Sequence, residues 1–193
     1  IRMSNWNDSC PLVDPLCGSG TFLIEAVSIA LGMPPGISRD FLIPNWNDFD
    51  LNLWQREKEF ASSKKLLDKK LPNIVGCEQN HEIANQAKSN ISAAGLDQYI
   101  DIHNCSFNKL SLPSQKGILV CNPPYGKRIG HETELVGLYE ELGSFCKSNA
   151  SGWELWVLSG NAQLSRSLRM KATRRYQISN GGIDCRWLFY KVQ

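Results

Sequence analysis

The four residues Asn122-Pro123-Pro124-Tyr125 bring together groups that can bind a flat amine. Each proline fixes its own φ and restricts the residue before it, so the pair holds the local backbone in one conformation. That conformation pre-orders the Asn122 amide, the Pro123 carbonyl and the Tyr125 ring. Two hydrogen-bond acceptors beside an aromatic face suit a planar group with an exocyclic NH2, and a nucleobase fits that description. The other interpretation is that the prolines only end a strand.

A glycine-rich segment, VDPLCGSGTFLIEA over residues 13–26, is a second candidate site. A short apolar stretch ends at Asp14, a turn with two glycines follows, and then an apolar helical run begins. Open α/β sheets bind ligands at the carboxyl ends of their strands, and glycine lets a ligand approach the backbone closely. The spacing is neither GxGxxG nor a P-loop, so a pyrophosphate cradle is disfavoured, whereas Asp14 can accept from a cationic group. The alternative is a plain turn capped by Ser19 or Thr21.

Glu78 is the third candidate, because it directly follows an apolar stretch over residues 73–77. An acidic residue at the end of the second strand of a doubly wound sheet commonly binds ribose hydroxyls. A glutamate after a strand is otherwise usually a solvated loop residue. Its place after a glycine-rich first turn favours the binding role.

These candidates all follow short apolar runs that predict strands and that alternate with helices. Such alternation predicts a mostly parallel sheet with helices on both faces, and an Asn-Gly-Gly signal near the end predicts an antiparallel hairpin. The expected strands cover residues 11–14, 73–78, 99–103, 117–121, 155–158, 171–179 and 183–192. The expected helices cover residues 21–31, 52–71, 81–94 and 134–147, the second with a narrow apolar face. We expect residues 1–193 to form a single α/β domain.

The charge of the chain is small overall but unevenly distributed. The net charge is +2, too little to indicate a nucleic-acid partner. Residues 161–193, however, contain seven Lys and Arg against one Asp, a net +6. One-sided charge of this kind suits a polyanion, or it is a solvated basic face.

Cysteines and hydropathy exclude several classes of protein. The seven cysteines form no CxxC pair, and the three histidines complete no zinc spacing, so we expect no metal and reduced thiols in a reducing compartment. No run approaches 18 apolar residues, so we expect no membrane span. The chain opens on Ile1 without a signal-peptide pattern, which predicts a fragment of a longer protein.

Together, DPLCGSGTFLIEA, the strand end at Glu78 and NPPY resemble S-adenosylmethionine-dependent amino-methyltransferases. The resemblance extends along the chain through three further segments, NWNDFDLNLWQREK, NPPYGKRIG and the closing RRYQISNGGIDCRWLFYKV. These segments resemble the THUMP-associated bacterial large-subunit rRNA guanine-N2 methyltransferases, the RlmL-like, UPF0020-type family. The resemblance covers nearly the whole chain.

The resemblance implies a Rossmann-like S-adenosylmethionine-dependent methyltransferase fold, with a mostly parallel seven-stranded sheet, helices on both faces and a C-terminal antiparallel hairpin. Family members usually carry an Asp that contacts the adenine amino group, where this chain has Ser106, which carries no charge. The cofactor-binding residues implied are Asp14, Pro15, Cys17, Gly18, Ser19, Gly20, Thr21, Glu78, Ser106 and Asn122. The catalytic residues implied are Asn122, Pro123, Pro124 and Tyr125.

The implied reaction is methyl transfer to the exocyclic N2 of a guanine in large-subunit rRNA. Asn122 and the Pro123 carbonyl would accept the amino hydrogens, and Tyr125 would stack on a base that is single-stranded or flipped out. Other interpretations stay open. They are an adenine-N6 methyltransferase, a protein-glutamine methyltransferase, and a non-catalytic RNA-binding domain with a weakened cofactor pocket.

The expected partner is RNA, and the expected location is the cytoplasm or an organelle with its own ribosomes. The family places RNA-capturing elements upstream, so we expect this chain alone to bind RNA weakly. Lys127 and Arg128 directly follow the candidate site, where they could contact a phosphate or lie in a solvated loop. The sequence leaves the oligomeric state open.

Overall fold

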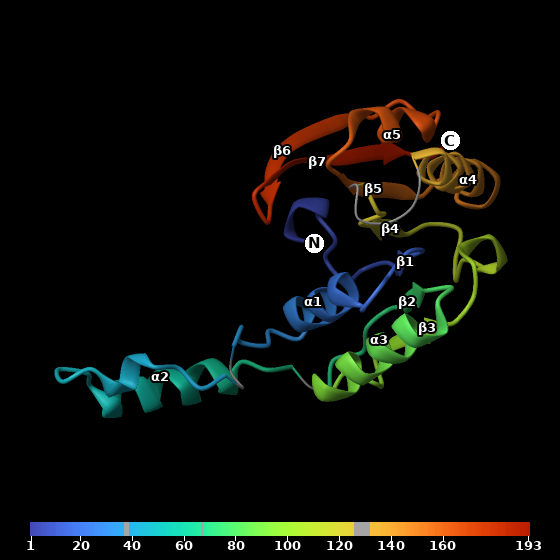
Figure 1. Cartoon of the computed structure of the whole chain (residues 1–193). Helices are drawn as coiled ribbons and strands as arrows, with labels where there is room; N and C mark the ends of the chain where they lie inside the picture. Colours follow the sequence, from blue (N-terminus) through green and yellow to red (C-terminus); the bar gives the residue numbers. More distant parts are fainter. Residues whose placement is uncertain (37–38, 67, 126–131) are drawn as a thin grey trace.

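One twisted sheet of seven strands runs through the molecule (Figure 1). The computed structural model describes residues 1–36, 39–66, 68–125 and 132–193. Along the sheet the strand order is β3-β2-β1-β4-β5-β7-β6. The strands are β1 (Leu12–Asp14), β2 (Ile74–Cys77), β3 (Ile100–His103), β4 (Ile118–Cys121), β5 (Glu154–Ser159), β6 (Arg174–Asn180) and β7 (Ile183–Lys191). This is the Rossmann-like arrangement that the sequence predicts.

The strand pairing puts β1 in the interior of the sheet, between β2 and β4. Val13 pairs in parallel with Val75 of β2 on one side and with Leu119 of β4 on the other. Strands β3 and β5 extend the parallel part, and β7 then runs antiparallel to both β5 and β6. Strands β2 and β3 therefore lie on one side of β1 and strands β4 to β7 on the other, and the switch between β1 and β4 is where such sheets bind ligands.

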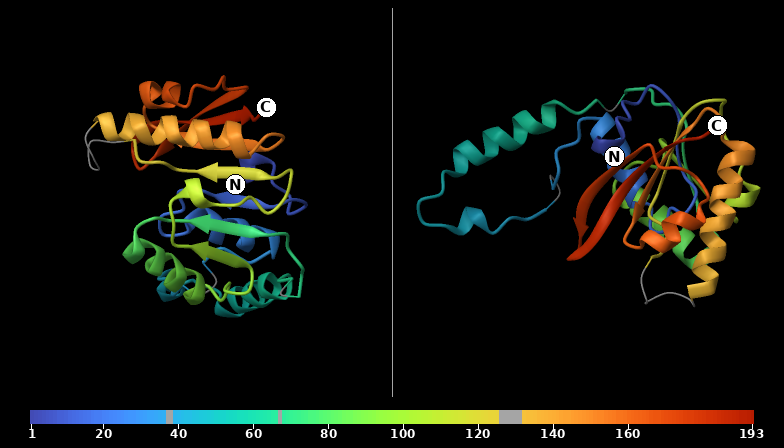
Figure 2. Two further views of the ribbon diagram at one scale, coloured as in Figure 1. Left: turned by 90° about the vertical axis from the view of Figure 1, so that its right-hand side faces the viewer. Right: turned by 90° about the horizontal axis from the view of Figure 1, so that it is seen from above.

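Helices cover both faces of the sheet because successive strand residues point in opposite directions. Leu12 packs with α1 (Thr21–Ala30) and α3 (His81–Ala93) in one apolar cluster. Val13, the next residue, packs in a second cluster with α4 (Glu132–Asn149) and α5 (Ala162–Ser167) on the other face. The right-hand view in Figure 2 shows α1 and α4 on opposite sides of the sheet. The short α5 is an element that the sequence analysis did not predict.

Stacked aromatic rings attach the C-terminal hairpin to β5. The Trp156 ring lies 4.7 Å from the Phe189 ring and 5.7 Å from the Trp187 ring, measured between centroids. Tyr176 of β6 stacks on Trp156 from further along the sheet, at 6.2 Å. Stacked pairs of this kind stabilise beyond the area they bury. The hairpin is therefore a rigid continuation of the parallel sheet.

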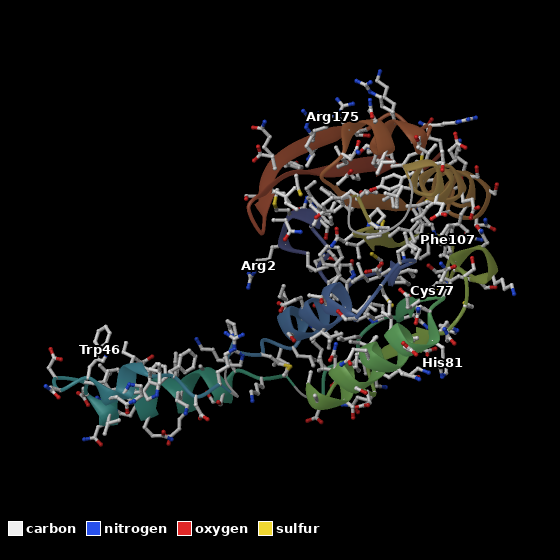
Figure 3. The ribbon with its side chains drawn as sticks, viewed as in Figure 1. Arg2, Trp46, Cys77, His81, Phe107 and Arg175 are labelled. Carbon is white, nitrogen blue, oxygen red and sulfur yellow. The ribbon has the colours of Figure 1, made fainter. Side chains whose placement is uncertain are left out.

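The helix expected over residues 52–71 is shorter than predicted, and none of its residues is buried. The α2 helix spans Leu51–Ser63, begins with the Asp50 side chain as its N-cap, and has no buried residue. Its predicted apolar face stays exposed, since Leu53 is 47% and Phe60 is 58% exposed. Figures 1 and 3 show this segment projecting from the body of the molecule. Its own aromatic contacts, Phe41 and Phe49 against the edge of Trp54, hold it together.

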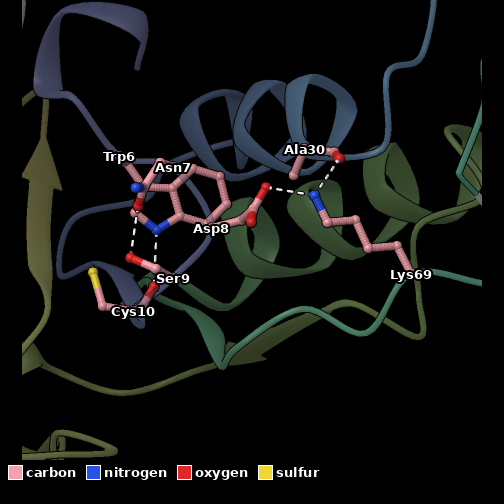
Figure 4. Close-up of polar contacts among 7 residues, drawn as sticks. All are labelled: Trp6, Asn7, Asp8, Ser9, Cys10, Ala30 and Lys69. Carbon is pink, nitrogen blue, oxygen red and sulfur yellow. Dashed lines mark hydrogen bonds and ion pairs between the residues drawn. The ribbon is translucent and has the colours of Figure 1, made fainter.

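The first ten residues are tied to the segment that leads into β2. The Lys69 ammonium lies 2.7 Å from Asp8 and also donates to the Ala30 carbonyl at the end of α1 (Figure 4). The buried Trp6 ring donates through Nε1 to the Cys10 carbonyl at 2.8 Å. These contacts close the base of the projecting segment against the sheet.

Among the described residues, no helix is long and apolar enough to span a membrane.

Candidate functional site

The loop between β1 and α1 is held in a conformation that requires glycine. Gly18 and Gly20 have φ values of +52° and +84°, a region that other residues rarely adopt. Gly20 is the N-cap of α1, so the first N–H groups of the helix lie at this loop. The loop is fastened to β2 because the Cys17 N–H donates to the Cys77 carbonyl at 3.0 Å. A Cβ on Gly18 would meet no atom within 4 Å, so the space beside this residue is open to a ligand.

Asp14 is a buried carboxyl at the end of β1, only 2% exposed. Its Oδ1 accepts the Leu16 N–H at 3.0 Å. Burial raises the pKa of Asp14 to about 8, the Leu16 N–H counteracts the rise, and the charge of Glu78 adds to it. The negative charge of Glu78 thus opposes the ionisation of Asp14, and near neutral pH Asp14 is mostly protonated. A cationic ligand placed between the two carboxyls would favour the ionised form of Asp14.

Glu78 lies at the predicted place, with its backbone bonded on both sides. Its N–H donates to the His103 carbonyl at 3.1 Å, and its carboxylate Oε1 accepts the Asn80 N–H at 2.8 Å. The Asn104 amide donates to the Glu78 carbonyl at 2.9 Å and to the Gln79 carbonyl at 3.2 Å. The loops after β2 and β3 are thus fixed to each other.

Asn104 and two residues of α3, His81 and Asn85, form a chain of polar contacts beside Glu78 that the sequence analysis missed. Asn104 Oδ1 lies 3.1 Å from His81 Nδ1, and the other ring nitrogen of His81 lies 3.0 Å from the Asn85 amide. Asn90, further along α3, donates to the Ser19 carbonyl at 3.0 Å. Asn104 follows β3 by one residue, and this position at a strand end is the only signal that the sequence offers for it.

Ser106 lies beyond the end of β3, half-buried, as the sequence analysis placed it. Its hydroxyl is used locally, because its oxygen accepts the Asn108 N–H at 3.4 Å as the N-cap of the 3-10 turn Phe107–Lys109. The residue before it, Cys105, has its sulfur 3.3 Å from the sulfur of Cys77. All seven cysteines of the chain are free thiols in the structure.

The Asn-Pro-Pro-Tyr segment leaves β4 directly beside Asp14. Cys121, the last residue of β4, is buried, and burial together with the charge of Asp14 raises the pKa of its thiol. The Asn122 side chain that follows is exposed at the strand end, whereas Pro123 is buried. The segment is therefore anchored at the proline and presents its amide outward. The rest of the NPPYGKRIG match, with Lys127 and Arg128, lies outside the described residues.

Tyr125 is held by three contacts with the C-terminal part of the sheet. Its hydroxyl oxygen accepts from the Asn180 amide at 2.9 Å and from the Cys185 thiol at 3.6 Å. Its ring lies against Gly160, where an added Cβ would come within 2.7 Å of the ring carbon Cδ2. Burial and the Cys185 thiol raise the pKa of the Tyr125 phenol, which the Asn180 donor partly counteracts, so the ring carries no charge near neutral pH.

The structure thus gathers the predicted residues at one edge of the sheet, the carboxyl ends of β1, β2, β3 and β4. Ser19 and Thr21 are exposed on the loop, with their hydroxyl oxygens 3.4 Å apart, and Pro15 is buried beneath it. A cavity of about 770 Å³ lies instead at the amino ends of β2 and β3 and contains none of these residues. Among the described residues, no group of three metal-ligating side chains comes together.

Known proteins are similar to this chain in sequence and in fold. A ribosomal RNA large subunit methyltransferase K/L from Marinomonas is 35% identical over 194 residues, which are 96% of this chain and 27% of that protein. The structure of SMU.472 complexed with SAH superposes with a TM-score of 0.91 at 28% identity, over all of this chain and 50% of that one. A structure titled a predicted N6-adenine-specific DNA methylase, from Listeria monocytogenes, gives a TM-score of 0.86 at 28% identity, over 98% and 48%.

The chain spans between about a quarter and half of the length of these relatives. Residues 1–188, nearly the whole chain, match a single family, UPF0020, described as the RMKL-like methyltransferase domain. The glycine loop, the acid at Glu78 and the Asn-Pro-Pro-Tyr segment all lie within this match. The chain belongs to the UPF0020 family of RMKL-like methyltransferase domains.

Proposed function

We propose that this domain transfers a methyl group from S-adenosylmethionine to the exocyclic N2 amino group of a guanine in large-subunit rRNA. The observation that carries the proposal is the position of Asn122-Pro123-Pro124-Tyr125. The segment leaves β4 next to the buried Asp14 and the open glycine loop of β1. A group that binds at the loop and a base that binds at the segment would therefore meet at the switch point of the sheet.

The residues around the loop fit the proposed cofactor. S-adenosylmethionine supplies a methyl group on a positively charged sulfur and also carries an ammonium group. The charge of Glu78 helps to keep Asp14 protonated, and a cation bound between the two side chains would favour the Asp14 carboxylate. Gly18 leaves the space beside the loop open, and Glu78 lies where a doubly wound sheet binds ribose hydroxyls.

Asn122 and Pro123 would orient the amino group that accepts the methyl. The lone pair of a base amino group is delocalised into the ring, which makes it a poor nucleophile. The Asn122 amide oxygen and the Pro123 carbonyl can accept its two hydrogens and favour a pyramidal nitrogen. The rate gain then comes from orientation and preorganised dipoles, without a strong base.

Tyr125 would form the platform for the target base. Its ring is neutral and is fixed by Gly160, Asn180 and Cys185 before any substrate arrives. Stacking on such a ring contributes about 1–3 kcal/mol per base. A paired base cannot reach it, so the target is single-stranded or flipped out.

The choice of guanine N2 follows from the family resemblance and from the named K/L relatives. One observation favours a second candidate. The Listeria structure is titled for adenine N6 in DNA, and the same acceptors would bind that amino group equally well. The two proposals therefore differ in the nucleobase that is methylated, and they share the chemistry of the Asn-Pro-Pro-Tyr segment.

A methyl-transfer assay tests the proposal. The full-length protein is incubated with tritiated S-adenosylmethionine and unmodified large-subunit rRNA, and the labelled nucleoside is mapped. We expect label on guanine N2. Asn122→Ala should reduce transfer by about 100-fold or more, as loss of an oriented dipole at the reacting group does. Its affinity for S-adenosylmethionine in a calorimetric titration should change little.

The matched control is Asn52→Ala, which removes an exposed asparagine from α2. It should retain full transfer. Label on adenine N6, of RNA or of DNA, would replace the guanine proposal with the second candidate. Absence of S-adenosylmethionine binding would favour a non-catalytic domain.

A further inference from the structure

A groove runs along the hairpin face that α5 covers, starting beside Tyr125. Its first part is a cavity of about 510 Å³ at the carboxyl end of β5, lined in part by Gly160, Gln177 and Cys185. Its second part is a cavity of about 280 Å³ between α5 and the hairpin. The two cavities share Ala162, Ser165 and Arg186 in their walls, so they are neighbours. We call the surface of both cavities the basic groove.

The basic groove adjoins the proposed base platform directly. Gly160 and Cys185 line its first part, and both also contact Tyr125, one through the ring and the other through the hydroxyl. A nucleotide whose base stacks on Tyr125 therefore has its neighbours in the chain at the mouth of the groove.

Three arginines give the groove its charge, and each comes from a different element. Arg166 lies on α5, Arg175 on β6 and Arg186 on β7. Arg175 pairs with Leu188 and Gln177 pairs with Arg186, a register that puts Arg175 and Arg186 on the same face of the hairpin. Figure 3 shows Arg175 on the outer side of this hairpin.

The charge of these arginines is not balanced by nearby carboxylates. Asp184 is the one acidic residue among the described residues that line the groove. Within the described part of the chain, neither Arg166, Arg175 nor Arg186 forms an ion pair. Arg169, which lies outside the groove lining, is by contrast paired with Glu140 at 2.8 Å.

We propose that the basic groove binds the phosphates of the RNA strand that flank the target nucleotide. The proposal rests on the proposed function, because that function puts a base on Tyr125 and so fixes where the strand enters. Guanidinium groups bind phosphate oxygens in a planar, two-pronged geometry, and unpaired arginines are available for it. Contacts to phosphates fix the register of a strand without reading its sequence. The groove would therefore hold the strand while the acceptor site selects the base.

Fluorescence anisotropy with a labelled 12-nucleotide single-stranded RNA tests the groove on the whole chain. The test variant combines Arg166→Ala, Arg175→Ala and Arg186→Ala. At low salt we expect its affinity to fall at least about tenfold, and the slope of log K against log salt to decrease in magnitude by about 2. The same three positions changed to Lys should recover most of the affinity, because lysine keeps the charge.

Two controls separate the groove from net charge. A distal variant, Arg56→Ala with Lys64→Ala and Lys88→Ala, removes the same charge from α2, its C-cap and α3 and should bind RNA within about threefold of wild type. Arg169→Ala should also bind normally. Equal losses in the groove and distal variants would overturn the proposal, and so would wild-type affinity in the groove variant or an absence of RNA binding by the wild type.

The outcome is distinguishable from a failure of the proposed function. Titration of S-adenosylmethionine into the same groove variant should give wild-type affinity and shows that the fold is intact. If the wild type binds no S-adenosylmethionine yet needs the three arginines for RNA, the methyltransferase proposal fails and the groove stands. If the groove variant loses affinity for a single-stranded DNA of the same sequence but keeps wild-type affinity for the RNA, RNA is the wrong partner.

Discussion

The amide of Asn180, at the end of β6, donates a 2.9 Å hydrogen bond to the hydroxyl of Tyr125, in the segment that follows β4. These residues are 55 positions apart in the chain, and the bond spans the sheet from its parallel part to its antiparallel hairpin. The hairpin therefore helps to set the plane of the ring that we propose as the base platform. Its part in the site is as direct as that of the glycine loop.

Tyr125→Phe should lower the rate of methyl transfer without weakening cofactor binding. The variant keeps the ring but removes the hydroxyl that Asn180 and Cys185 hold, so the platform loses its anchor. A hydrogen bond of this kind contributes about 0.5–1.5 kcal/mol, which corresponds to a few-fold to about tenfold decrease in kcat. Steady-state kinetics and a calorimetric titration with S-adenosylmethionine measure the two effects. An unchanged kcat would show that the ring needs no anchor.

Gly160→Ala should displace the Tyr125 ring and impair transfer more than Tyr125→Phe does. A Cβ at this position would come within 2.7 Å of ring carbon Cδ2 and 2.8 Å of Cε2, closer than real contacts allow. Gly137→Ala, in α4, is the control, because a Cβ there meets no atom within 4 Å. Kinetic assays measure methyl transfer by both variants. Equal activity of Gly160→Ala and Gly137→Ala would mean that the Tyr125 ring does not lie against Gly160 in solution.

Asp14 should make the folded domain less stable as the pH rises from about 4 to about 8. Burial raises its pKa from 3.8 to about 8, so in this interval the folded state keeps a proton that the unfolded state has released. One proton corresponds to a loss of about 1.4 kcal/mol of unfolding free energy per pH unit. The contribution is fully present below pH 4 and is lost as the pH rises through 8.

Urea unfolding at pH 5, 6, 7 and 8 measures this slope. Asp14→Asn, which cannot ionise, should remove the slope due to Asp14, whereas the exposed Asp48→Asn should leave the wild-type profile. Parallel profiles of Asp14→Asn and wild type would mean that the carboxyl is already ionised in the folded protein.

Binding of S-adenosylmethionine near pH 7 should release close to one proton. The pKa of about 8 means that Asp14 is mostly protonated in the free domain, and a bound ammonium group favours the carboxylate. Calorimetric titrations in phosphate and in Tris, whose ionisation enthalpies differ, count the released protons. Asp14→Asn should bind more weakly and release none. Equal enthalpies in the two buffers would contradict the contact with Asp14.

The sequence predicted the parallel strands well because most of them are short apolar runs followed by a turn residue, and the Asn-Gly-Gly turn predicted the polar hairpin strand β6. The strand-end positions of Asp14, Glu78 and Asn122 followed from the same runs, since parallel strands share a carboxyl edge. The predicted extent of α2 was wrong. The spacing of its apolar residues indicates an apolar face of a helix, but it does not show whether any other part of the chain covers that face. The bonds from Asn104 and Asn180 join loops that are distant in sequence, and no local pattern reports them.

The strand order also divides the candidate site between two consecutive segments of the chain. Residues up to β3 contribute the glycine loop, Asp14 and Glu78, whereas residues from β4 onward contribute Asn122, Tyr125 and the hairpin that holds the ring. The two segments meet where β1 pairs with β4. If the proposed function holds, substitutions in the second segment can change the methyl acceptor while the glycine loop, Asp14 and Glu78 stay unchanged, so a domain of this design can acquire a new substrate by changes in one segment of the chain.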